Sequence, residues 1–218
     1  MLIATGLPPL TANVTNTVAQ MPGYLSIVEG YRPDLRGQGP RIRALLAPTL
    51  VGALAGVGLL ALGGEETFEA VVPWLILGAC ALLAIQPRLA ARLRARTEER
   101  TGLSAPLLLA VAAGAAYASY FGAAAGVLLL AILAVGISDR LQRLNALNRF
   151  LVLLANAIAV PALILVAPVD WAAVAVLAPA TLIGGAAGAR LARRLADHHL
   201  RGAVIVLGIG VAVWLMFR

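Results

Sequence analysis

The sequence predicts an all-α integral membrane protein made of two inverted repeats of transmembrane helices, with one broken, re-entrant segment. Three observations support this prediction: the hydropathy of the chain, an apolar run too long for one upright helix, and an internal repeat. Hydrophobic residues make up 61% of the 218 residues, charged residues 12%, and the mean hydropathy is +0.91. This composition is unlike that of soluble domains. The length allows about seven spans of roughly 20 residues each, so we expect a single membrane domain over residues 1–218.

The first expected helix, residues 11–29, carries its polar side chains on one face. At about 100° per residue, five polar side chains fall within an arc of roughly 100°. They are Asn13, Asn16, Thr17, Gln20 and Tyr24. A helix of this kind can pack against lipid or other helices on its apolar side and meet a polar group on the other.

Further spans are expected at residues 44–62 and 70–85, separated by an acidic loop at 63–69 and followed by a basic loop at 87–102. The apolar run 103–137 would reach about 50 Å as one helix, against a hydrocarbon core of about 30 Å. We expect a break at residues 118–126, around Ser119, Gly122 and Gly126. The alternative is a single tilted helix in which the two glycines form a packing interface. Three more spans are expected at 144–167, 171–189 and 202–217, with a basic loop at 190–201.

The chain matches itself at a shift of 132 residues without a gap. Paired asparagines and glycines at one constant offset indicate a duplicated unit. The matched pairs are Asn13 and Asn145, Asn16 and Asn148, Thr49 and Thr181, Gly52 and Gly184, Gly56 and Gly188, and Gly78 and Gly210. The second polar face consists of Asn145, Asn148, Arg149 and Asn156. We assign residues 1–87 to the first repeat, 88–102 to a basic cytoplasmic linker and 103–218 to the second repeat.

The loop charges predict the orientation of the two repeats. An excess of arginine marks cytoplasmic loops, which places the basic loops 31–43 and 87–102 inside and the acidic loop 63–69 outside. If segment 103–137 enters and leaves on one side, the basic segments 138–143 and 190–201 are inside as well, and the repeats are inverted. At the offset of 132, residues 103–132 would pair with residues before Met1, so we expect the first element of the first repeat to be missing.

Inverted repeats with a broken segment are how secondary transporters build a site near the bilayer midplane. The N-terminus of the second half-helix favours an anion, and the amides can donate hydrogen bonds to oxyanion oxygens. We expect substrate to bind at Asn13, Asn16, Thr17, Gln20, Tyr24, Ser119, Gly122, Gly126, Asn145, Asn148, Arg149 and Asn156. The alternatives are that the asparagines only join neighbouring helices and that Arg149 extends to the cytoplasmic surface.

Four glycines at repeat-related positions have the spacing of small residues at helix–helix contacts. Gly52, Gly56, Gly184 and Gly188 are therefore expected to serve packing instead of binding.

Two segments resemble a known family. Residues 6–19 read GLPPLTANVTNTVA and are followed by PGY at 22–24, and residues 182–194 read LIGGAAGARLARR. The chain is similar over nearly its whole length to the TauE/SafE family of sulfite and organosulfonate exporters. The resemblance implies export of small sulfur-containing anions across a prokaryotic inner membrane by a multi-pass permease with two helical repeats. The chain departs from the family by lacking the glycine-rich segment that normally precedes the GLPP motif.

Other classes of function find less support in the sequence. There is no HExxH, no Gly-x-Ser-x-Gly and no aspartate well inside an expected span, so we expect no enzyme activity, metal or cofactor. The 17 basic residues are all arginine and bunch between apolar segments, which does not suit nucleic acid. The expected partners are the lipid bilayer and a small anion. An anion channel and a non-transporting scaffold or assembly protein remain the alternatives, and the oligomeric state, the anion, the direction and the coupling ion are open.

Overall fold

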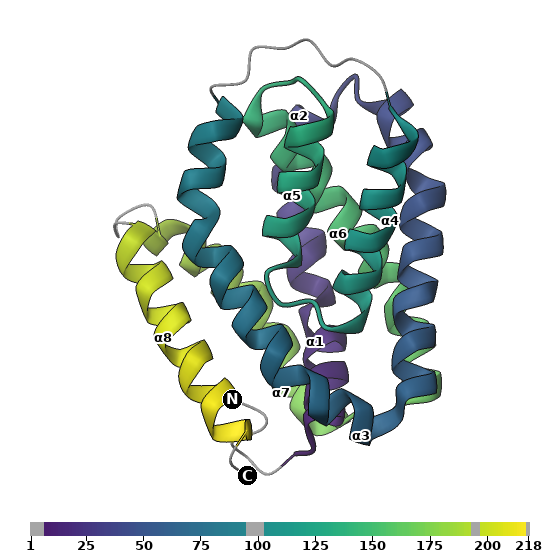
Figure 1. Cartoon of the computed structure of the whole chain (residues 1–218), viewed down its shortest axis with the longest axis vertical. Helices are drawn as coiled ribbons and strands as arrows, with labels where there is room; N and C mark the ends of the chain where they lie inside the picture. Colours follow the sequence, from purple (N-terminus) through teal and green to yellow (C-terminus); the bar gives the residue numbers. More distant parts are fainter. Residues whose placement is uncertain (1–6, 95–102, 193–196, 217–218) are drawn as a thin grey trace.

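The computed structural model describes residues 7–94, 103–192 and 197–216, and these form helices with no strand among them (Figure 1). The helices are α1 (Pro9–Gly30), α2 (Arg32–Leu35), α3 (Gly39–Arg94), α4 (Ala105–Tyr120), α5 (Ala125–Gly136), α6 (Leu141–Val166), α7 (Trp171–Ala192) and α8 (Asp197–Met216). By length and composition, residues 39–85 of α3 and the whole of α6 can cross a bilayer, and the shorter α4 and α5 and segments of α7 and α8 are also apolar. The all-helical part of the predicted fold is confirmed.

Helix α3 is two limbs joined at one residue. Gly64 has φ 64° and ψ −169°, a conformation open mainly to glycine, and the chain reverses there (Figure 1). The residues on both sides remain helical, so the prediction of a loop at 63–69 is wrong except at this point. The start of the basic loop predicted at 87–102 is also wrong, because the second limb continues as a helix to Arg94. Leu, Ala, Glu and Arg are good helix formers, and charge alone does not end a helix.

The apolar run 103–137 is broken, as predicted. Helix α4 ends at Tyr120, residues 121–124 connect, and α5 returns beside it to the end from which α4 started (Figure 1). Gly122 has φ 79° and Ala124 φ 56°, so two left-handed residues make the turn. The Tyr117 hydroxyl donates to the Ala123 carbonyl oxygen over 2.7 Å. These two helices therefore form a hairpin whose tip lies inside the molecule.

Close packing holds this hairpin against the first limb of α3. A Cβ atom built on Gly52 would lie 2.0 Å from the Ala112 carbonyl oxygen, and one on Gly56 would lie 2.2 Å from that of Ala116. The helices can approach this closely only because these two positions are glycine. The repeat-related Gly184 and Gly188 belong to α7, and their surroundings lie outside the described residues.

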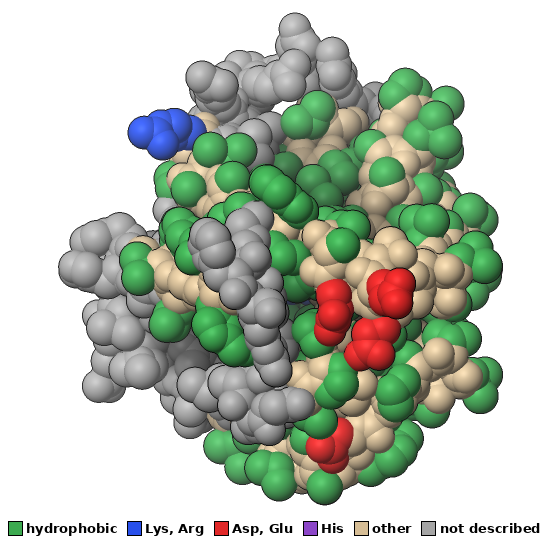
Figure 2. Space-filling view, turned by 60° about the horizontal axis from the view of Figure 1, so that its bottom comes forward, with side chains coloured by type: hydrophobic (Ala, Val, Ile, Leu, Met, Phe, Trp, Pro, Cys, Tyr) green, Lys and Arg blue, Asp and Glu red, His purple; other side chains and the backbone are tan. Residues whose placement is uncertain are grey.

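The two ends of the bundle carry opposite charge. Glu65, Glu66 and Glu69 are exposed next to the bend of α3, and Figure 2 shows acidic side chains gathered on this end. The other end carries α2, the start of α3 and the connection between α5 and α6 (Figure 1). Its described arginines include Arg32, Arg36, Arg41, Arg43, Arg140 and Arg143. We call these the acidic end and the basic end.

Asp139 joins several elements at the basic end. Its Oδ2 atom accepts hydrogen bonds from Arg41 of α3 and, over 3.2 Å, from Nε of Arg143 of α6. Burial raises the pKa of Asp139, but hydrogen bonds from Arg41, the Arg140 amide and Arg143 outweigh it and hold the pKa below its usual value. Gln38 adds a bond to the Arg143 carbonyl oxygen over 2.9 Å. The outer end of the hairpin is thereby tied to α3.

Candidate functional site

Two cavities lie between α1, α6 and the tip of the α4–α5 hairpin. The larger, of about 530 Å³, is lined by Pro9, Ala12, Asn13, Asn16, Thr17, Gln20, Tyr24, Phe68, Val72, Ile76, Phe121, Gly122, Ala123, Ala124, Asn156 and Leu177. The smaller, of about 250 Å³, is lined by Tyr24, Ala118, Gly122, Ala124, Ala125, Gly126, Val127, Leu130, Asn145, Asn148, Arg149, Val152 and Asn156. The structure thus brings together eleven of the twelve residues predicted for the site, counted across the two lining sets.

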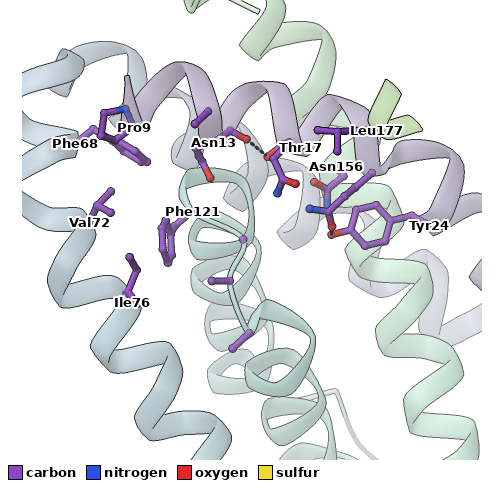
Figure 3. A pocket seen from close by; sticks show the side chains of 16 residues that line it. Pro9, Asn13, Thr17, Tyr24, Phe68, Val72, Ile76, Phe121, Asn156 and Leu177 are labelled. Carbon is purple, nitrogen blue, oxygen red and sulfur yellow. Dashed lines mark hydrogen bonds between the residues drawn. The ribbon is translucent and has the colours of Figure 1, made fainter. Parts of the chain in front are cut away.

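Helix α1 supplies the polar wall of the larger cavity. Its polar face points inward, and Figure 3 shows Asn13, Thr17 and Tyr24 along it. The Asn13 amide nitrogen donates to the Tyr120 carbonyl oxygen over 3.2 Å, and the Tyr24 hydroxyl donates to Oε1 of Gln20 over 2.9 Å. The first of these bonds links α1 to the last residue of α4. Helix α1 is therefore joined directly to the hairpin tip.

The opposite wall of the larger cavity is apolar and was not predicted from the sequence. Phe68, Val72 and Ile76 come from the second limb of α3, and Phe121 comes from the hairpin tip (Figure 3). The spacing of four residues from 68 to 72 to 76 puts these three side chains on one helix face. That spacing was visible in the sequence, but nothing in it separated a cavity wall from an ordinary packing face.

Arg149 lines the smaller cavity. It is the one basic residue among those that line either cavity. Its Nε atom is buried and has no hydrogen-bond partner among the described residues. A Cβ atom built on Gly126 would lie 3.5 Å from Nη1 of Arg149, so the guanidinium rests against the first turn of α5. A cation and the positive end of a helix dipole are thus close together, and both favour an anion.

Four of the five asparagines of the site, all except Asn16, each donate one amide N–H to the protein. Besides Asn13, Asn145 donates to the Tyr31 hydroxyl over 3.0 Å, Asn148 to the Gly126 carbonyl oxygen over 2.9 Å, and Asn156 to the Val152 carbonyl oxygen over 2.8 Å. A primary amide has two N–H donors. Each of these four side chains is therefore held in place by one N–H and keeps a second for another acceptor.

Ser119 is the predicted site residue that lines neither cavity. It lies on α4 one residue before the helix ends and is 3% exposed. Its Oγ atom has no hydrogen-bond partner among the described residues. A contact between Ser119 and a substrate stays a prediction.

The fold and the cavities define a class of protein: a helical protein with polar cavities in its interior and with helices long and apolar enough to cross a membrane. The family model described as sulfite exporter TauE/SafE matches residues 1–215. The chain belongs to the TauE/SafE family, and this membership implies a membrane transporter of sulfur-containing anions. Its members are transporters and not enzymes. Comparison with the curated proteins and with the solved structures gave no match.

Proposed function

We propose that this protein is a permease that exports sulfite or small organosulfonates across a prokaryotic inner membrane by alternating access. The observation that carries the proposal is the Arg149 guanidinium, which lies in a cavity beside the start of α5 without an acidic residue in the cavity lining. A charge inside a membrane protein is costly and marks a functional site by default. An oxyanion would supply the missing counter-charge.

The anion site is completed by neutral donors. Asn148 and Asn145 line the same cavity as Arg149, and each keeps one amide N–H after its bond to the protein. An oxyanion presents several oxygens, each of which accepts hydrogen bonds. Amide donors give directional contacts with less electrostatic attraction than a second cation would. Binding of this strength lets a substrate be released on the far side.

The order of the helices supports an inverted repeat. Shifted by 132 residues, the start of α1 at Pro9 falls on the start of α6 at Leu141, and the start of α3 at Gly39 falls on that of α7 at Trp171. Glu65, just after the bend of α3, falls on Asp197, where α8 begins. In Figure 1, α1 runs from the acidic end to the basic end, and α6 runs the opposite way. Two such repeats that rock against each other would expose the shared centre to each side in turn.

The charges at the two ends support the direction in which the chain is inserted. Cytoplasmic segments carry an excess of arginine, so the basic end would face the cytoplasm and the acidic end the outside. The hairpin of α4 and α5 then enters and leaves the membrane from the cytoplasmic side. We retain the division into a first repeat at 1–87, a linker at 88–102 and a second repeat at 103–218 as part of the proposal.

The test is flux into proteoliposomes of sulfite, a short organosulfonate, sulfate and chloride. We expect saturable flux of sulfite or the sulfonate, and at least a tenfold loss in Arg149→Gln and in the double variant Asn13→Ala with Asn145→Ala. The matched control is Arg88→Gln, which removes an exposed arginine that lines neither cavity. Undiminished flux in Arg149→Gln would overturn the anion site, and chloride flux without saturation would favour a channel.

A further inference from the structure

The two cavities meet at a small set of shared residues. Four residues line both: Tyr24, Gly122, Ala124 and Asn156. Gly122 and Ala124 belong to the hairpin tip, and the other two come from α1 and α6. In Figure 3, Tyr24 and Asn156 lie at one end of the larger cavity, and Pro9 and Phe68 lie at the other. These four residues therefore lie where the two cavities adjoin.

The cavities lie toward opposite ends of the molecule. The larger is lined by Pro9, the first residue of α1, and by Phe68, four residues after the bend of α3 at the acidic end. The smaller is lined by Asn145, in the second turn of α6, which begins at the basic end. The shared residues therefore separate a space on the acidic side from one on the basic side.

Tyr24 and Asn156 occupy equivalent positions in the two halves of the chain, because 156 is 24 shifted by 132. On the proposed repeat, this pair lies at the centre about which the two halves are related. The pair is unequal in size, since one member is a phenol and the other an amide. The larger side chain, Tyr24, supplies most of the bulk at this point.

Each member of the pair is held by its own helix. The Tyr24 hydroxyl donates to Gln20, and the Asn156 amide donates to Val152, each bond spanning four residues of one helix. Neither bond crosses between the two helices, so both survive if the helices move apart. Pro22 lies two residues before Tyr24 and removes one backbone hydrogen bond from α1. Helix α1 is thus less stiff next to Tyr24 than elsewhere.

We propose that Tyr24 and Asn156 form the barrier between the outward and inward cavities, with Tyr24 as the residue that closes it. This inference rests on the proposed transport function, but it concerns the path and not the anion. In this structure the pair lies at the boundary of the two cavities, and movement of α1 relative to α6 would widen the passage between them. Tyr24 then also limits the size of the substrate that passes.

The test uses single cysteines and a thiol reagent that does not cross membranes. In a Cys80→Ala background, one variant carries Asn16→Cys in the larger cavity and another Asn145→Cys in the smaller. With Tyr24 in place, we expect Asn16→Cys to react from the outside and Asn145→Cys from the cytoplasmic side. Adding Tyr24→Ala should make each cysteine react from the opposite side as well: Asn16→Cys from the cytoplasmic side and Asn145→Cys from the outside. Each of these rates should rise at least tenfold. Trp74→Ala removes an equally large aromatic side chain that is 67% exposed and lines neither cavity, and it should leave the sidedness unchanged.

Two results would overturn the proposal: an unchanged sidedness in Tyr24→Ala, or cysteines that react equally from both sides with Tyr24 present. Labelling needs no transported anion, so a failure of the barrier is distinguishable from a failure of sulfite or sulfonate flux. Monodisperse elution in detergent shows that each variant is folded. In the flux assay, Tyr24→Ala should increase the rate for a bulky sulfonate relative to sulfite at least threefold, and an unchanged ratio would contradict a role for Tyr24 in substrate size.

Discussion

Replacing Gly52 by alanine should weaken the packing of α3 against α4 by about 2 kcal/mol. The added Cβ atom would lie 2.0 Å from the Ala112 carbonyl oxygen, 2.8 Å from the carbonyl carbon and 2.9 Å from Cα. All three are backbone atoms, so no side chain can turn away and the helices must separate. Overpacking costs about 1–3 kcal/mol, and three short contacts put this case near the top of that range. The better helix propensity of alanine offsets about 1 kcal/mol.

Gly58 provides a matched control in the same limb of α3. A Cβ atom built there meets nothing within 4 Å, so Gly58→Ala should leave stability unchanged or raise it by up to about 1 kcal/mol. The assay is the midpoint of thermal unfolding of the purified protein in detergent. For a chain of this size, about 2 kcal/mol corresponds to a fall of about 4–8 °C.

A midpoint for Gly52→Ala equal to or above the wild-type value would refute the packing argument. It would mean that α3 and α4 are far enough apart to admit a Cβ atom at position 52, which the 2.0 Å distance from that atom to the Ala112 carbonyl oxygen does not allow. The same displacement moves α4, whose C-terminal end carries the hairpin tip. We therefore expect Gly52→Ala to reduce anion flux as well, although Gly52 lines neither cavity.

Three further variants test other contacts. Thr181→Val removes a hydroxyl of α7 that donates to the Ala19 carbonyl oxygen of α1 over 2.9 Å. The free energy of unfolding, measured by thermal unfolding, should fall by about 0.5–1.5 kcal/mol. Tyr117→Phe removes the bond to Ala123, and hydrogen exchange at residues 121–124 should become faster. The lowered pKa of Asp139 means that its contribution to stability is complete above about pH 5 and is lost as the pH falls below about 4. Asp139→Asn should therefore lower the thermal midpoint at pH 7, with a difference from wild type that shrinks at pH 3.

The helix break and the polar faces could be predicted from the sequence because each depends on local pattern. A mostly apolar run of 35 residues with glycines at its centre cannot cross a bilayer upright, and the structure breaks it at 121–124, within the predicted 118–126. The polar side chains at positions 13, 16, 17, 20 and 24 share one face by helical geometry alone. Their side chains accordingly line one cavity.

The apolar wall and the ends of the helices could not be predicted in this way. Phe68 and Phe121 line the cavity only because the bend at Gly64 and the turn at Gly122 bring distant segments together. Long-range contacts of that kind leave no local signal in so apolar a chain. The acidic residues around the bend looked like a loop, but glutamate is compatible with a helix and one glycine suffices to reverse the chain. Ser119 was expected in the site because it lies next to the break, but it is 3% exposed and lines neither cavity, so its role stays a prediction.

The charge of the site limits which oxyanions it can carry. Arg149 is the single charged residue among those that line the two cavities, and the other donors are neutral amides and hydroxyls. On the proposed function, a singly charged sulfonate or hydrogen sulfite would form a neutral complex with Arg149, whereas sulfate would leave one negative charge uncompensated. Unpaired charge in a low-dielectric interior is costly. We therefore expect the protein to transport singly charged sulfur oxyanions faster than sulfate, and equal rates at equal concentration would show that another cation contributes to the site.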